Sequence, residues 1–133
     1  MSFFDKLFGR KKRATQHQHE LFSPTAKDAL KEFSTLSADS RMIQIMRMGD
    51  SKPVNPVHLK FFQYAILSDP DVDVKFAALK RVHFFKEDPA VISMMKELKE
   101  KNNYEDMEPY FSMALNRLGL ISIEDFQKKI QGS

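Results

Sequence analysis

Apolar and polar positions repeat with the period of an α-helix along most of this chain. In each of seven segments the apolar residues recur every three or four positions, which places them on one face of a helix. These segments cover residues 24–36, 39–49, 56–66, 70–85, 89–98, 107–118 and 122–130. The pattern therefore predicts an all-α fold of about seven helices, each of about 9–14 residues, with a loop over residues 50–55.

Prolines and glycines mark the ends of the predicted helices. A residue whose side-chain oxygen can cap a helix precedes four of the six prolines, at Ser23-Pro24, Asn55-Pro56, Asp69-Pro70 and Asp88-Pro89. Proline in the first helical position after such a cap is typical of a helix start. Gly9, Gly49 and Gly119 each follow an apolar helical pattern and predict helix ends in the left-handed conformation. Ser122 and Asp125 predict a capping box for the last helix.

An internal repeat relates two of the helical segments. Residues 69–82 match residues 105–118 after a shift of 36 positions, so that Ala78-Leu79 falls on Ala114-Leu115 and Arg81 falls on Arg117. A period in the thirties that is built from paired helices indicates a solenoid, whose units bury their apolar faces against their neighbours. We therefore expect a short solenoid of antiparallel helical hairpins.

Residues 56–118 resemble HEAT repeats, and the motif that carries the resemblance lies within residues 57–82. In that family an apolar helix ends at Asp-Pro, and Asp-x-x-Val-Lys/Arg-x-x-Ala opens the next helix. The corresponding residues here are Asp69, Pro70, Asp71, Val74, Lys75, Ala78 and Leu79, with Ala114 and Leu115 in the repeated copy. The resemblance implies a turn at Asp69-Pro70-Asp71, a close helix contact at Ala78-Leu79, and the scaffold or adaptor role of most of the family. Lys75 replaces the commoner arginine, which argues against a bidentate ladder between repeats.

The first 13 residues combine an apolar helical face with a basic run. A helix that Ser2 and Asp5 cap and Gly9 ends would carry its four large apolar residues on one side. The segment resembles the "FFDKLFG"-type amphipathic starts of bacterial membrane-associated proteins, which implies reversible attachment to an anionic membrane. The candidate docking residues are Phe3, Phe4, Lys6, Leu7, Phe8, Arg10, Lys11, Lys12 and Arg13.

Three interpretations of this N-terminal segment stay open. It can dock on a membrane or a protein partner, cap the chain's own helical stack, or serve as a nucleic-acid or localisation arm. Because a helix of about seven residues is marginal in water, we expect it to be ordered only on a surface. Residues 14–22 predict a flexible linker, and residues 23–131 form the expected helical-repeat domain.

Composition and charge narrow the function classes. The 133 residues include 42% apolar and 29% charged side chains, which suits one globular domain, and the absence of cysteine excludes disulfides and thiolate metal sites. Of the 21 basic and 18 acidic residues, five basic and one acidic lie in residues 1–13, leaving 16 basic and 17 acidic in the body. This nearly neutral body argues against a nucleic-acid partner. The lack of a long apolar run predicts a cytoplasmic protein that the N-terminal segment can hold at the inner face of a membrane.

Candidate sites for metals and catalysis are weak in this sequence. Asp69, Asp71 and Asp73 lack the glycine and glutamate of a calcium loop, and we expect no metal, cofactor or catalytic residue. His58 and His83 are expected to be partly buried or surface residues. One member of each aromatic pair, Phe61-Phe62 and Phe84-Phe85, is expected to face a neighbouring repeat or a partner. The sequence thus favours a non-enzymatic adaptor that binds a protein. The alternatives are a nucleic-acid-binding HEAT-like protein and, less favoured, an enzyme on a HEAT-like scaffold.

Overall fold

The chain is helical throughout the part described by the computed structural model, which comprises residues 22–102 and 104–131. Within these ranges there is no strand, and the seven α-helices are α2 (Ala29–Thr35), α3 (Ala38–Gly49), α4 (Leu59–Leu67), α5 (Val72–Leu79), α6 (Pro89–Lys101), α7 (Tyr110–Arg117) and α8 (Ile123–Gln131). Short 3-10 helices accompany them at η2 (Pro56–His58), η3 (Val82–Phe85) and η4 (Glu105–Met107). The all-α fold with about seven helices is therefore confirmed. The N-terminal segment lies outside the described residues.

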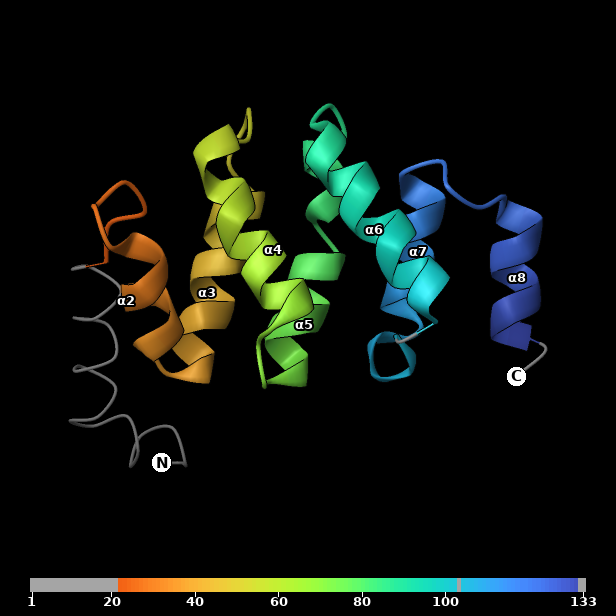
Figure 1. The fold of residues 1–133 in the computed structure, drawn as a ribbon, viewed down its shortest axis with the longest axis horizontal. Helices are drawn as coiled ribbons and strands as arrows, with labels where there is room; N and C mark the ends of the chain where they lie inside the picture. Colours follow the sequence, from red (N-terminus) through yellow and green to blue (C-terminus); the bar gives the residue numbers. More distant parts are fainter. Residues whose placement is uncertain (1–21, 103, 132–133) are drawn as a thin grey trace.

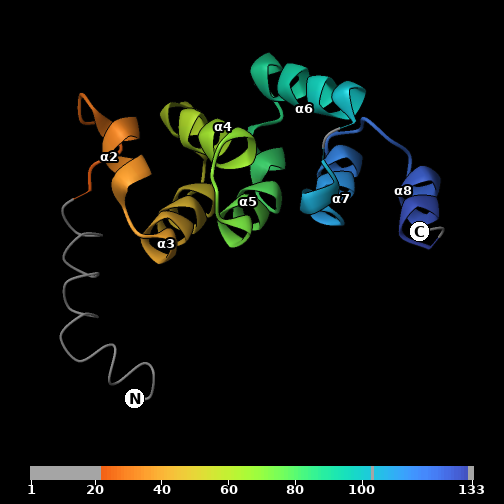
Figure 2. The ribbon, with the colours of Figure 1, turned by 60° about the horizontal axis from the view of Figure 1, so that its bottom comes forward.

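The helices follow one another along the longest axis of the molecule in the order of the sequence (Figure 1). Figure 2 shows two layers, with α2, α4 and α6 on one side and α3, α5 and α7 on the other. Within the layers α3 packs against α5, α5 against α7, and α2 against α4. The pair α4 and α5 joins the layers, and α8 packs against α7 at the far end.

Apolar side chains from both layers form a continuous core. The rings of Phe33 and Phe61 lie 5.2 Å apart, and those of Phe62 and Phe85 lie 4.9 Å apart, at tilted angles that suit aromatic pairs. All five apolar residues of the repeat motif are buried in this core: Val74, Ala78, Leu79, Ala114 and Leu115. Burial of each of the larger apolar side chains contributes about 1.5–3 kcal/mol, so the repeated motif residues stabilise the contact between successive helices.

Phe22, the first described residue, belongs to the core. Its ring lies 6.0 Å from that of Phe33 and 5.7 Å from that of Phe61, and the residue is buried. From the sequence this residue was placed in the linker, because no helical period of apolar positions extends to it from the preceding polar residues. The buried core instead extends to Phe22, one residue earlier than the expected domain start.

Three predicted helix starts are confirmed and two are wrong. Asn55 and Asp88 cap η2 and α6, and the Ser122 hydroxyl accepts the N–H of Asp125 at 3.0 Å. The helix predicted from Ser23-Pro24 begins only at Ala29, after a series of turns. Its supposed cap is engaged elsewhere, because the hydroxyls of residues 23 and 25 pair at 3.3 Å.

The start predicted at Asp69-Pro70 is also displaced. The cap of α5 is Asp71, whose carboxylate accepts the N–H groups of Asp73 and Val74 at 2.9 and 3.2 Å. The Asp69 carboxylate is instead bound by Arg41 from α3 and accepts the N–H of Asp71 in the turn.

Two glycines at helix ends have different physical roles. Gly119 has φ +75° after α7, as predicted for a residue in the left-handed conformation. Gly49 is instead the last residue of α3 and does not have a positive φ, so that prediction is wrong. A Cβ atom at Gly49 would lie 2.6 Å from Cδ of Arg81, so glycine is needed there for the close approach of that side chain.

Candidate functional site

A buried ion pair joins α3 to the turn before α5. Arg41 donates from Nε to Oδ2 of Asp69 at 2.7 Å and from Nη2 to Oδ1 at 3.0 Å. The N–H of Asp71 donates to the same carboxylate at 2.9 Å, and the Asp69 side chain is fully buried. The hydrogen bond with Asp69 raises the pKa of Arg41 above its ordinary value. Three hydrogen bonds thus compensate the buried carboxylate.

A weaker ion pair joins α5 to η4, before α7. Lys75 of α5 lies 3.4 Å from Oδ2 of Asp106 in η4, and the Asp106 side chain is 65% exposed. Arg41 and Lys75 are each the fourth residue of their helix, and each contacts an aspartate that precedes the next helix of the same layer. The two pairs therefore join neighbouring helices of one layer in a similar way, and we call them the links.

A second kind of link lies at the carboxyl ends of the same helices. Arg81 reaches back across Gly49 and contacts Oδ1 of Asp50 at 3.2 Å, directly after α3. Arg117 reaches back in the same way and donates to the carbonyl oxygen of Lys80 at 3.2 Å, directly after α5. Cations favour the negative ends of helices. The 36-residue shift that relates the two arginines in the sequence thus relates two similar contacts.

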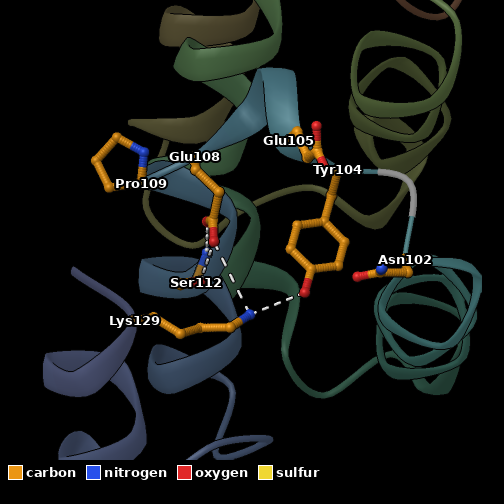
Figure 3. Close-up of a pocket in the computed structure, with 7 residues that line it drawn as sticks. All are labelled: Asn102, Tyr104, Glu105, Glu108, Pro109, Ser112 and Lys129. Carbon is orange, nitrogen blue, oxygen red and sulfur yellow. Dashed lines mark hydrogen bonds and ion pairs between the residues drawn. The ribbon is translucent and has the colours of Figure 1, made fainter. Parts of the chain in front are cut away.

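A pocket of about 500 Å³ lies among the end of α6, η4, the start of α7 and α8 (Figure 3). The Glu108 carboxylate accepts the Ser112 hydroxyl at 2.6 Å and the Ser112 N–H at 2.8 Å. This carboxylate caps α7, because the N-cap residue Pro109 has no side-chain acceptor. Lys129 of α8 donates to the Tyr104 hydroxyl at 3.0 Å and lies 3.9 Å from Oε2 of Glu108. These groups satisfy one another and connect α8 to α7.

A second pocket of about 620 Å³ opens at the carboxyl ends of α3, α5 and α7. Three of its lining residues are cations and one is a carboxylate, and the full lining is Asp50, Lys80, Arg81, His83, Phe84 and Arg117. The rings of His83 and Phe84 lie 4.2 Å apart. Burial lowers the pKa of His83, and the charges of Arg117 and Lys86 lower it further. We call this the basic pocket.

The structure places the sequence-predicted residues in different settings. The docking residues of the N-terminal segment, Phe3 to Arg13, lie outside the described residues. Among the repeat-motif residues, Asp69 and Lys75 form the links above and Asp71 caps α5, while Pro70 is exposed in the turn. Of the aromatic pairs, Phe61 and Phe62 are both buried, whereas Phe84 is 43% exposed and Phe85 is buried.

Sequence reasoning missed Arg41 and Asp106 as partners in the links, and it missed Lys80 of the basic pocket. Arg41 could have been found, since it follows its cap Ser37 by the same interval that separates Lys75 from Asp71. The 36-residue shift, which relates Arg81 to Arg117, was the one signal in the sequence that cations would gather here. The helical period of a segment shows which of its faces is apolar, but it does not show which residues of other helices that segment contacts.

No helix among the described residues has both the length and the apolar character needed to cross a membrane. In the same part of the chain, no three histidine, aspartate or glutamate side chains come together as a metal site. Comparisons with known protein families, curated proteins and solved structures find no match. The functional argument therefore depends on the geometry of this chain.

Proposed function

We propose that this protein is a non-enzymatic adaptor of HEAT-like repeats, which presents its helical surface to a protein partner. The observation that carries the proposal is the pair of equivalent links, Arg41–Asp69 and Lys75–Asp106. Each connects the fourth residue of one helix to the turn before the next helix of its layer. Repetition of one contact in successive units is what a stacked repeat protein requires.

The layered arrangement supports the same proposal. Helices two apart in the sequence, such as α3 and α5 or α5 and α7, contact one another along the axis (Figure 2). Stacking of this kind leaves a long surface exposed and buries a core between neighbouring units. Such surfaces bind extended partners in repeat proteins, which is why a scaffold role fits this shape.

The polar cluster of Figure 3 supports a structural role in place of catalysis. Its hydroxyl group, on Ser112, is fully buried and donates to the Glu108 carboxylate that caps α7. Lys129 contacts both that carboxylate and Tyr104. A catalytic nucleophile and its base need an accessible position beside a substrate, and this serine does not have one.

The amphipathic N-terminal segment is proposed to dock the adaptor on an anionic membrane or on a partner. Its apolar residues gain free energy by partial burial in the interface, and each basic residue adds about 1 kcal/mol near an anionic leaflet. The proposal places the protein in the cytoplasm and, when docked, at the inner face of the membrane.

Cosedimentation with vesicles tests this docking. The full chain should bind phosphatidylglycerol-containing vesicles, lose binding as salt increases, and lose it with Phe4→Asp plus Leu7→Asp. Leu67→Asp plus Ile123→Asp is the matched control, since both residues are exposed apolar side chains of the helical body. Binding that survives the first double change, or disappears equally with the second, contradicts docking by this segment.

Pull-down of partners by the full chain tests the adaptor role. A specific protein should be retained by the wild type and by the Ser112→Ala variant, because the proposal gives that serine no catalytic task. Hydrolytic or transfer activity that Ser112→Ala abolishes, in a protein that remains folded, would show that the chain is an enzyme.

A further inference from the structure

We infer that the basic pocket and an adjoining apolar groove form one site for a partner segment that carries a carboxylate and a large apolar side chain a few residues apart. This inference rests on the proposed adaptor function and names the chemistry of the partner. The residue that connects the two halves of the site is Phe84, which lines both.

Two cations of the basic pocket, Lys80 and Arg117, have no carboxylate partner among the described residues. Asp50 contacts Arg81 at 3.2 Å, but within residues 22–102 and 104–131 neither Lys80 nor Arg117 forms an ion pair. Both are held in place by uncharged groups. The Lys80 ammonium lies 4.7 Å from the centre of the Tyr110 ring, and Arg117 donates to a backbone carbonyl. Two positioned cations at an open pocket suit an incoming carboxylate.

The groove on the other side of Phe84 is mainly apolar. It has a volume of about 460 Å³ and is lined by Val54, Pro56, Phe84, Phe85, Glu87, Asp88 and Pro89. Phe84 is 43% exposed and its ring is supported by that of His83. An apolar side chain of a partner that lies in this groove covers Phe84 and removes its ring from water, which favours binding.

The charges around Phe84 fix the orientation of the bound segment. Lys80 and Arg117 line the basic pocket, which is the first part of the site, and the acidic Glu87 and Asp88 line the groove, which is the second. A carboxylate is attracted to the first part and repelled from the second. The apolar residue therefore enters the groove while the acidic residue enters the basic pocket.

The same charges favour an acidic peptide over a nucleic acid. A strand has a phosphate at every nucleotide, so phosphates would meet Asp50, Glu87 and Asp88 as it crossed the site. A peptide needs its negative charge only in the basic pocket. Binding of short segments with a few anchoring residues is also the usual mode of an adaptor surface.

Selection from a random heptapeptide library displayed on phage tests the site on the immobilised full chain. The enriched peptides should contain an aspartate or glutamate within a few residues of a phenylalanine, leucine or isoleucine. Affinities of the synthetic peptides for each variant are then measured by fluorescence anisotropy. We expect Arg117→Gln and Phe84→Ser each to weaken binding by about tenfold or more.

Matched controls separate loss of the site from loss of the fold. Lys99→Gln removes an exposed cation of α6, and Leu67→Ser removes an exposed apolar side chain of α4, so both should retain wild-type affinity. Circular dichroism verifies that each variant is folded. If Arg117→Gln unfolds the chain, Lys80→Gln and Phe84→Ser carry the test.

The outcomes distinguish this site from the adaptor function. Peptides that bind equally well to all variants overturn the site and leave the adaptor proposal standing. Enrichment of no peptide, together with failure of the pull-down, overturns both. A fluorescent oligonucleotide that binds the wild type but not the Phe84→Ser and Lys80→Gln variants overturns the peptide site in favour of a nucleic acid.

Discussion

The link between α3 and the turn before α5 and the link between α5 and η4 each start from the fourth residue of a helix, but they differ in strength. The first is a guanidinium that holds a fully buried carboxylate with two hydrogen bonds, and the second is one ammonium contact to an exposed carboxylate. Position in the helix thus determines which residues meet. Burial and the shape of the cation determine how much each contact contributes to the stability of the fold.

The largest effect should come from removal of the buried carboxylate. Asp69→Ala leaves the Arg41 guanidinium buried without a counter-charge, and we expect it to lower the free energy of unfolding by about 3–5 kcal/mol. Asp106→Ala, at the equivalent exposed position, should change it by less than about 1 kcal/mol. Urea denaturation followed by circular dichroism measures both. Equal losses in the two variants would mean that burial is not the source of the difference.

Exchange of the two cations separates the effect of side-chain shape from that of burial. Arg41→Lys keeps the charge but removes the two parallel hydrogen bonds, and should cost about 1–3 kcal/mol. Lys75→Arg should raise stability by at most about 1 kcal/mol, because its partner Asp106 is exposed. The same urea titrations measure these changes. A large gain from Lys75→Arg would show that shape alone makes the first link stronger.

The carboxyl ends of the helices extend the comparison. Arg81 packs on Gly49 at the first junction, so Gly49→Ala should cost about 1–3 kcal/mol through overpacking. In an Arg81→Gly background, which also removes the Cβ atom of residue 81 that would lie 2.9 Å away, the same change should stabilise by up to about 1 kcal/mol, because alanine is the better helix former. Thermal and urea unfolding of the four proteins in this cycle measure the coupling. Independent effects of the two substitutions would contradict the close contact.

A smaller effect on the stability of the fold is expected at acidic pH. Burial lowers the pKa of His58 and of His83, and Arg117 and Lys86 add to the effect at His83. The unfolded chain therefore binds more protons than the folded chain below about pH 6.5, so stability falls as the pH decreases through that value. The midpoint of thermal unfolding should drop between pH 7.5 and 5.5, and His83→Gln should reduce the drop. A midpoint that does not change with pH would show that neither histidine makes stability depend on pH.

The helices could be predicted from sequence because each one is specified locally. The apolar stripe of the α7 segment and the capping pair Ser122 and Asp125 each lie within a few residues of the structure they determine. The local capping rule placed the helix start at Asp69 and could not find the partner of that carboxylate, Arg41, which lies 28 residues away. The basic pocket escaped prediction for the same reason, since its cations come from separate helices.

The way α8 is attached has a consequence for motion. Among residues 123–129 of this helix no side chain is buried, and Lys129 connects it to Tyr104 and Glu108 (Figure 3). Local opening is least costly where little apolar surface is lost. The amide protons of α8 should therefore exchange with deuterated solvent well before those of α5. This end of the molecule would then unfold locally while the central helices stay folded.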